Sequence, residues 1–524
     1  MCKIIQRLLL ILFFIPQALC MSAQGLRIIR GNCTPGITCE ATRGLEQQGQ
    51  TRKYLRAPDT NWNPNKIYRQ MVILVSYADT DFTAEDANRY YDRVFNESGY
   101  NEGAGAGCVA DYFREQSNGL FNLQFDIYGP YKTSGKAQPY DHPTNRTQNY
   151  GASVMREATL QMVAQNQEID YKQYDWDGDG KVDQVIYIYA GVGGNQGEGS
   201  YGHVWPNTFT FAIVTTPDGT AIQTYSCSAE LWRENLLCGI GTVCHEFCHC
   251  LGLPDIYPTG GNSGYYSVAD EWDLMDGGNF TNTGWCPPNF TAQEKMLMGW
   301  LTPVELTKPT AISGMKAVSE GGETYIIKHT DSEYLLLENR QWKGWDAGVP
   351  GRGLVVYHVD YDRTTWANNT VNNVSGHFRF DLVHADNLDY EQWDAILPRT
   401  ASQYAEAPMM HNKHLSTSPY PWTTDSTTFV NRELTDSSIP AAAMYTPNAK
   451  GSVLLSKTIT NVQMTDEGLI SFDFMGGAPS SVSTVQPQLA DDHLYNIMGQ
   501  RLTVPYKGLY IKNGKKYIKN HNIN

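Results

Sequence analysis

Apolar residues in the first 300 positions fall into short runs and regular repeats that predict a mixture of strands and helices. From Met71 the unbroken run M-V-I-L-V predicts a buried strand, and residues 120–128 alternate apolar and polar side chains as a half-buried strand does. Further elements are predicted as helices at 83–95 (with Thr83 as N-cap), 110–116 and 152–165, a strand at 184–189, and a last helix ending at Gly252. Residues 66–300 are therefore expected to form an α+β domain.

After residue 301 the pattern changes to short strands separated by turns. Good strand candidates lie at 324–329, 334–338 and 354–360. Residues 301–477 are therefore expected to form a β-rich, sandwich-like module. Residues 478–524 are expected to be a linker rich in Ser, Val and Gln, followed by a small, basic C-terminal β unit.

The N-terminus has the pattern of a secretory signal peptide over residues 1–23. A basic segment containing Lys3 precedes the apolar stretch 8–15, which is too short to span a bilayer. Cleavage is expected after Cys20 or after Ala23, and acylation of Cys20 is disfavoured because a bulky leucine precedes it. No other segment approaches 18 uninterrupted apolar residues, so no transmembrane segment is expected.

Composition indicates an ordinary soluble protein of two or three domains, since the chain has 524 residues, 41% hydrophobic and 18% charged. The formal net charge of −15 argues against a nucleic-acid partner, because phosphate binding requires a basic surface. The simplest interpretation of this charge is solubility. We expect a monomer.

Two of the 11 cysteines lie in the predicted signal, which leaves an odd number for the exported chain. Residues 24–65 lack periodicity and are expected to be a short pro-segment or linker. Within it, Cys33 and Cys39 are expected to form a disulfide, and the alternative is that one of them caps the metal site as a thiol. The remaining cysteines are expected in local disulfides or as buried thiols, with pairings that the sequence does not determine.

The most informative segment is T-V-C-H-E-F-C-H-C-L-G-L-P-D-I-Y, which contains H-E-x-x-H-x-x-G-x-x-D. On a helix, His245 and His249 lie one turn apart, so their imidazoles share a face and are placed to bind one zinc ion. Glu246 lies beside them as a candidate general base for a metal-bound water. Gly252 allows the chain to turn back, so that Asp255 becomes the third ligand. Three protein ligands are typical of a catalytic zinc site, which keeps a fourth position open.

Downstream, W-D-L-M-D-G-G places Met275 in a glycine-rich turn that is expected to form a hydrophobic floor beneath the metal. Glu271 is the rival third ligand, because some zinc peptidases use a glutamate further along the chain. The Gly-x-x-Asp spacing favours Asp255.

The long zinc motif and the W-D-L-M-D-G-G segment together resemble the metzincin-type zinc metallopeptidases of the immune inhibitor A family, which are secreted by bacteria. Other similar stretches are D-Y-F-R-E-Q-S, E-N-R-Q and P-G-R-G-L-V-V-Y-H-V-D. The resemblance covers roughly residues 66–477 and implies a metzincin-like catalytic domain with an extracellular or cell-surface location. Cys248 departs from the family, in which a small residue is expected, but it does not lie on the face of the two histidines.

The C-terminal unit resembles short domains on exported Bacteroidetes proteins, some of which are sorting signals; the alternative is a cap that adds stability.

A second candidate metal site is the loop D-W-D-G-D-G-K-V-D. Calcium takes six to eight oxygen ligands, and alternating carboxylates in a glycine-rich loop are suited to wrap around one ion. The loop lacks the glutamate at position 12 of the helical calcium motif, and an acidic turn without an ion is the alternative. A bound calcium is expected to be structural. Its ligands would be the side chains of Asp175, Asp177, Asp179 and Asp183 and the backbone carbonyl of Lys181.

Four further residues are weaker candidates. His203 and His358 are placed to line a cleft, although a lone histidine is more often a packed core residue. Tyr257 and Tyr266 lie near enough in sequence to stabilise an oxyanion. None of the four is assigned a role.

The sequence thus predicts a secreted zinc endopeptidase that hydrolyses extracellular proteins or peptides, with Glu246 as general base. The alternative is a surface adhesion or glycan-binding protein with a structural or vestigial zinc site. An intact Glu246 argues against it, because a structural site needs no general base.

Overall fold

The structure is a computed structural model. It describes residues 58–141, 146–195, 202–233, 235–260, 268–374, 376–388, 415–423, 430–477, 494–496, 501–502, 508–512 and 515–519. The predicted signal peptide, Cys33, Cys39 and most of the predicted pro-segment and linker lie outside these residues. Among the described helices, none is long and apolar enough to cross a membrane.

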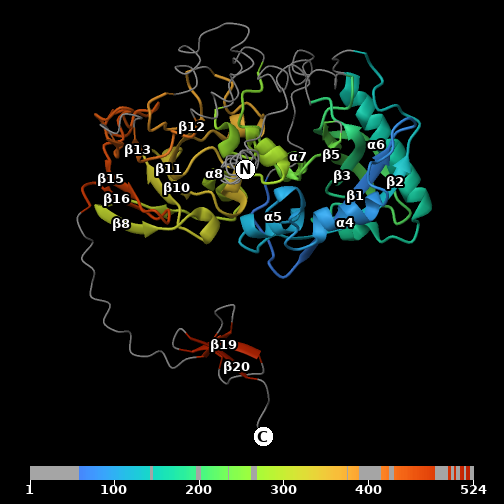
Figure 1. Cartoon of the computed structure of the whole chain (residues 1–524), viewed down its shortest axis with the longest axis horizontal. Coiled ribbons are helices and arrows are strands. Elements are labelled where there is room, and N and C mark those ends of the chain that lie inside the picture. The colour runs from blue at the N-terminus through green and yellow to red at the C-terminus, as the bar shows by residue number, and fades with distance from the viewer. Residues whose placement is uncertain are drawn as a thin grey trace, which may run out of the picture.

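The first half of the described chain is built on a six-stranded mixed sheet (Figure 1). Its main path runs β2-β1-β3-β5-β4, in which β4 alone pairs antiparallel to its neighbour, and β6 pairs with β5. The bounds are β1 Ile67–Ser76, β2 Asn122–Lys132, β3 Val185–Val192, β4 Asn207–Thr215, β5 Ala221–Arg233 and β6 Leu236–Leu237. The strands predicted from Met71, at 120–128 and at 184–189 are confirmed within a few residues.

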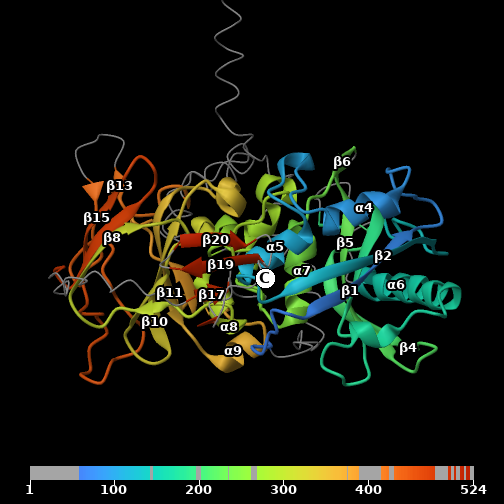
Figure 2. The same cartoon turned by 90° about the horizontal axis from the view of Figure 1, so that it is seen from below.

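Both faces of this sheet are covered, which explains the unbroken apolar run of β1. Side chains on one face, including Val72 and Leu74, pack in a core with helices α4, α5 and α7. Those on the other, including Met71 and Ile73, pack against α6 (Figures 1 and 2). The bounds of these helices are α4 Ala87–Asn96, α5 Val109–Gln116, α6 Arg146–Gln165 and α7 Gly241–Leu251.

The predicted start of the first helix is wrong. α4 begins at Ala87, and the carboxylate of Asp86 caps it by accepting the backbone N–H of Arg89. The N–H and hydroxyl of Thr83 instead donate to Oε1 of Glu230, both at 2.6 Å. Glu230 is completely buried, and a buried carboxylate requires donors. This tertiary demand overrides the local capping preference of Thr83.

The helix that ends at Gly252 is not the last helix of the first 300 residues, which is a second correction. α8 spans Ala292–Leu297 and begins with a capping box, in which Thr291 and Glu294 each bond the backbone N–H of the other. The capping signal T-A-Q-E is present in the sequence, but a helix of six residues is too short to show a helical period.

The second half of the described chain consists mainly of antiparallel sheets. A five-stranded sheet has the order β12-β11-β10-β9-β7, a three-stranded sheet β15-β16-β8, and a two-stranded sheet β13-β14. The predicted strands at 324–329, 334–338 and 354–360 are confirmed as β9, β10 and β11. The bounds are β7 Val304–Glu305, β8 Thr310–Met315, β9 Tyr325–Lys328, β10 Glu333–Arg340, β11 Gly353–Asp360, β12 Phe380–Leu382, β13 Trp422–Thr423, β14 Val430–Asn431, β15 Ile459–Met464, β16 Ile470–Phe474 and a short helix α9 Arg363–Ala367.

Further along, a four-stranded antiparallel sheet has the order β18-β17-β19-β20, and the division into a linker and a separate C-terminal unit stays a prediction. Its strands are β17 Leu494–Asn496, β18 Arg501–Leu502, β19 Gly508–Lys512 and β20 Lys515–Lys519.

The five-stranded sheet shares a core with the first half of the chain. Leu336 and Tyr357 lie in the same buried cluster as Val72 of β1 and Phe247 of α7. Alternate residues such as Leu335 face a separate core with the three-stranded sheet. The described part of the chain is therefore mixed α+β, as predicted, whereas the division into a domain at 66–300 and a module at 301–477 stays a prediction.

A fully buried arginine joins the two halves. Arg340 of β10 donates to both carboxylate oxygens of Asp346, at 2.8 and 2.6 Å, and to Oε2 of Glu338 at 3.1 Å. It also donates to the backbone carbonyls of Trp272 and Asn289. Burial opposes a charged guanidinium, but the carboxylates outweigh it and hold the pKa of Arg340 well above its usual value.

The seven cysteines among the described residues are all free thiols, and none forms a disulfide. They are Cys108, Cys227, Cys238, Cys244, Cys248, Cys250 and Cys286. All but the half-buried Cys238 are buried. Of the two expectations, local disulfides or buried thiols, the structure has thiols. Burial raises the pKa of the Cys286 thiol to about 12, which keeps it protonated at neutral pH.

Replacing Arg340 with alanine is expected to destabilise the fold strongly. The change leaves Glu338 and Asp346 buried without their cation, a loss of about 3–5 kcal/mol. Thermal unfolding of the two proteins checks this. The control is Arg352→Ala, which removes an exposed arginine lying over the Trp342 ring and is expected to shift the midpoint little. Equal midpoints for Arg340→Ala and the parent would contradict the role of this network.

Candidate active site

The helix α7 places the two histidines of the long motif on one face. The ring centroids of His245 and His249 are 4.8 Å apart, and both side chains are buried. The helix ends at Gly252, whose φ of 101° lies in the left-handed region that favours glycine. The N–H of Gly252 bonds the carbonyl of His249, and the chain turns back at this point, as predicted.

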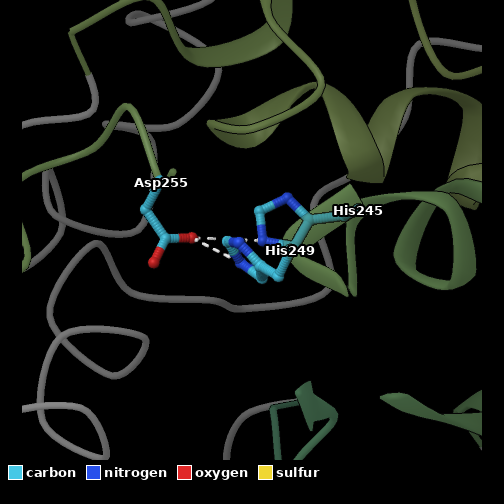
Figure 3. Close-up of side chains that lie close together, drawn as sticks. All are labelled: His245, His249 and Asp255. Carbon is cyan, nitrogen blue, oxygen red and sulfur yellow. Dashed lines mark ion pairs between the residues drawn. The ribbon is translucent and has the colours of Figure 1, made fainter. Parts of the chain in front are cut away.

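This turn brings Asp255 to the two imidazoles (Figure 3). Its Oδ1 lies 3.3 Å from Nε2 of His245 and 3.0 Å from Nε2 of His249. The three side chains form a group whose donor atoms all lie within 4.8 Å of one another. The residues predicted as zinc ligands are therefore brought together at one point.

The donor atoms fit a tetrahedral zinc ion. Ligands at about 2.0–2.1 Å from zinc stand roughly 3.3 Å apart, close to the separations between Asp255 and the imidazoles. Nδ1 of His245 lies 2.9 Å from the carbonyl of Leu274, and Nδ1 of His249 lies 2.8 Å from that of Leu253. A carbonyl only accepts, so each Nδ1 carries a proton, and Nε2 is the ring nitrogen that remains for a metal ion.

The environment of His245 favours its charged form in the absence of a metal. Burial opposes the charge, but the bond to Asp255 and the nearby Glu246 carboxylate outweigh it and raise the pKa of His245. The same negative potential attracts a metal cation. Proton and metal therefore compete for this site.

Glu246 is buried beside the histidines and has a fixed partner. The hydroxyl of Thr208 on β4 lies 2.6 Å from the backbone carbonyl of Glu246 and 3.1 Å from its Oε2. β4 is the antiparallel edge strand of the first sheet. Sequence reasoning did not find Thr208, because nothing local connects it to the motif 38 residues later.

The segment around Met275 supports the site through its backbone. The carbonyl of Leu274 accepts from His245, and that of Met275 accepts the N–H of Ile256 at 2.9 Å. Met275 is fully buried in the core that contains α7. The turn is held by Asp273, whose Oδ1 accepts the N–H of Met275 at 2.6 Å.

A second residue missed by sequence reasoning is Asn369, which follows α9. Its Oδ1 accepts the backbone N–H of Asp255 at 2.7 Å, and its Nδ2 donates to Oδ2 of Asp255 at 2.6 Å. The two residues are 114 positions apart. No motif spacing signals such a contact.

The remaining candidates are placed differently. Glu271, the rival third ligand, is buried but is not part of the histidine group. The Tyr257 ring stacks on His245 at 6.4 Å. His358 Nε2 lies 2.8 Å from Oε1 of Glu333, its ring stacks on Tyr445, and it is not part of the histidine group. His203 is half-buried and, among the described residues, is not part of the histidine group. Tyr266 lies outside the described residues.

The acidic loop gathers three of its four predicted carboxylates. Asp175, Asp177 and Asp183 form a group that is able to hold a metal ion. Backbone amides bend the loop around Asp175, which accepts from Gly178 at 2.7 Å and from others. Asp179 is not in the group; its Oδ2 pairs with Lys181 at 2.7 Å.

These features define a class of protein. A mixed α+β domain that directs two helical histidines and a buried carboxylate to one point, with a glutamate beside them, has the architecture of a metallopeptidase catalytic domain.

Comparison with known proteins shows which metallopeptidases this chain is similar to. Residues 54–300 match the family model described as immune inhibitor A peptidase M6, catalytic domain. The chain is 25% identical over 269 residues to immune inhibitor A of Bacillus thuringiensis subsp. alesti, covering 43% of this chain and 38% of that protein. It is 23% identical over 268 residues to the pre-pro-metalloprotease PrtV of Vibrio cholerae, covering 46% of this chain and 28% of the relative. The aligned part thus spans well under half the length of these curated relatives.

Residues 54–300 are therefore similar to the catalytic domain of the immune inhibitor A peptidases, which agrees with the resemblance of the long zinc motif and the Met275 segment.

The buried acids beneath the Met275 turn are expected to make stability depend on pH. Burial and the neighbouring charge of Glu294 raise the pKa of Asp273 well above its usual value, and burial raises that of Glu294. As the pH rises, the two acids lose their protons at a lower pH in the unfolded chain than in the folded protein. Their contribution to the stability of the fold is therefore complete below about pH 4. It is lost progressively as the pH rises through the folded-state pKa values.

Thermal midpoints of the metal-free protein between pH 5 and pH 8 test this dependence. Glu294→Gln keeps an acceptor for Thr291 and is expected to flatten the decline. Glu85→Gln, at an exposed position, is expected to leave it unchanged. An identical slope in all three proteins would contradict the assignment.

Proposed function

We propose that this protein is a secreted zinc endopeptidase that hydrolyses peptide bonds in extracellular proteins. The observation that carries the proposal is the convergence of His245, His249 and Asp255 on one point, with Glu246 beside them. The family match of residues 54–300 supports it. His245, His249 and Asp255 would hold the zinc.

When bound there, zinc would supply Lewis acidity, which polarises a scissile carbonyl and lowers the pKa of a water toward about 7. The chain supplies the proton transfers. The Glu246 carboxylate takes a proton from the attacking water and delivers it to the leaving amine nitrogen. The Thr208 hydroxyl contacts both the backbone carbonyl and Oε2 of Glu246. It thereby holds the Glu246 carboxylate in one orientation for proton transfer.

We further propose a metzincin-like arrangement for the catalytic domain, with Met275 as the floor of the site. The predicted signal peptide supports export to the outside or surface of a bacterium. The domain boundaries at 66, 300 and 477 belong to the same proposal. The alternative, an adhesion or glycan-binding protein with a vestigial zinc site, is not favoured, because Glu246 and its orienting contact are intact.

Removing the general base is expected to abolish proteolysis without removing the metal. Glu246→Ala should lower casein hydrolysis by about 10²–10⁴-fold, the usual contribution of general acid–base catalysis. A chelator should abolish the activity of the parent protein. Zinc content measured on the same preparation should remain near one ion per chain, because Glu246 is not one of the three ligands. Full proteolysis by Glu246→Ala would sink the mechanism.

We also propose a structural calcium ion in the acidic loop. The grouping of Asp175, Asp177 and Asp183 and the inward-directed backbone amides support the site. Because Asp183 lies just before β3, an ion there would pin the start of the central strand of the first sheet.

The test measures the thermal midpoint of metal-stripped protein before and after addition of Ca²⁺. The midpoint of the parent is expected to rise, because binding to the folded state alone stabilises it. Asp177→Ala should lose this rise. Asp179→Ala is the matched control, since Asp179 lies outside the group and pairs with Lys181, and it should keep most of the rise. No calcium-dependent rise in the parent would rule the site out.

A further inference from the structure

We propose that Asn369 is a positioning residue of the zinc site, which acts by orienting the third ligand, Asp255. The inference rests on the proposed function. It adds a part of the site that comes from outside the segment matching the peptidase family, which ends at residue 300.

One amide side chain bonds both the backbone and the carboxylate of Asp255. Oδ1 of Asn369 accepts the Asp255 N–H at 2.7 Å, and Nδ2 donates to Oδ2 at 2.6 Å. The first bond holds the backbone of Asp255 and the second holds its carboxylate, so the side chain is restrained at both ends. Oδ1 of Asp255 is thereby directed at His245 and His249, as Figure 3 shows.

The chemistry of an amide suits this task. Asp255 is completely buried, and a buried carboxylate needs donors. A lysine or arginine would neutralise the charge that a metal cation requires, whereas an amide donates without adding charge. Asn369 therefore bonds the Asp255 carboxylate without adding a positive charge beside it, and of the two carboxylate oxygens it engages Oδ2.

Asn369 is itself held rigidly. It is 4% exposed and has a φ of 57°, a left-handed conformation that asparagine tolerates better than most residues. Its N–H bonds the carbonyl of Trp366 at the end of α9, and its own carbonyl accepts the hydroxyl of Thr259 at 2.5 Å. The position of the amide is therefore determined by the fold and not by Asp255 alone.

Two further asparagines bind the same stretch of chain but not the ligand. Asn372 donates to the carbonyls of Ile256 and Phe380, both at 2.8 Å. Asn373 accepts the N–H groups of Thr259 and Gly260, at 2.7 and 3.0 Å. Asn369, Asn372 and Asn373 are here called the asparagine clamp. Of the three, Asn369 is the one that the structure places on the carboxylate of Asp255.

This difference separates orientation of the ligand from simple support of the loop. Asn369→Asp keeps an oxygen to accept the Asp255 N–H but places a second oxygen against Oδ2, where the donor is lost and two negative charges meet. Asn373→Asp is the matched control, because it makes the same chemical change in the same clamp without touching Asp255. Loop support alone predicts similar effects of the two substitutions.

The experiment measures zinc affinity of the full chain by competition with a chromogenic chelator. Asn369→Asp is expected to weaken zinc binding about 10–100-fold, the usual effect of removing a group that orients a metal ligand. Asn373→Asp should stay within about threefold of the parent. The visible absorption of the Co²⁺-substituted protein should change for Asn369→Asp only. Circular dichroism checks that each variant is folded.

If Asn369→Asp does not fold, Asn369→Ser replaces it, because serine accepts from the backbone but is too short to reach Oδ2. Parent-like zinc affinity and Co²⁺ absorption in the folded variant would overturn the proposal, as would equal losses in both asparagine variants. Failure of the proposed function is a separate result, since the parent protein would then neither bind zinc tightly nor cleave casein.

Discussion

The burial of the Asp255 carboxylate is the constraint on which the site depends. A carboxylate with no access to water must find donors within the protein, and these come from two directions. Asn369 bonds one oxygen, and the imidazoles of His245 and His249 face the other. The imidazoles are held in turn by the carbonyls of Leu274 and Leu253. Each partner fixes the next, so the three side chains of the candidate metal site are preorganised by backbone and amide groups.

This arrangement brings the second half of the chain into contact with the candidate site. The five-stranded sheet packs one face into the core that contains α7, and Arg340 ties β10 to the backbone at Trp272, just before the Met275 turn. The turn after α9 then delivers Asn369 to Asp255. The segment that matches the peptidase family model, residues 54–300, thus has both core and polar contacts with residues beyond that range.

Much of the secondary structure could be predicted from the sequence, because apolar periodicity reflects which face of an element is buried. Three strands of each main sheet and the helices α5 and α7 follow it closely, whereas β4, β5, β6, β7 and β12 were not predicted. The predicted N-cap at Thr83 failed because buried Glu230 takes the N–H and hydroxyl of that residue. The helix α8 was missed because six residues are too few for periodicity to emerge. The described cysteines are free thiols, and their spacing in the sequence does not distinguish thiols from local disulfides.

Within the long motif, the sequence alone determined which residues meet. The helical period puts His245 and His249 on one face, and a glycine at 252 permits the turn that returns Asp255 to them. These relations are local, so they do not depend on the tertiary contacts around the motif. The partners of that motif were decided only by the tertiary structure. Thr208 reaches Glu246 from an edge strand, and Asn369 reaches Asp255 across 114 residues. Such contacts depend on how sheets and helices pack, and packing is a property of the whole chain that no short pattern records.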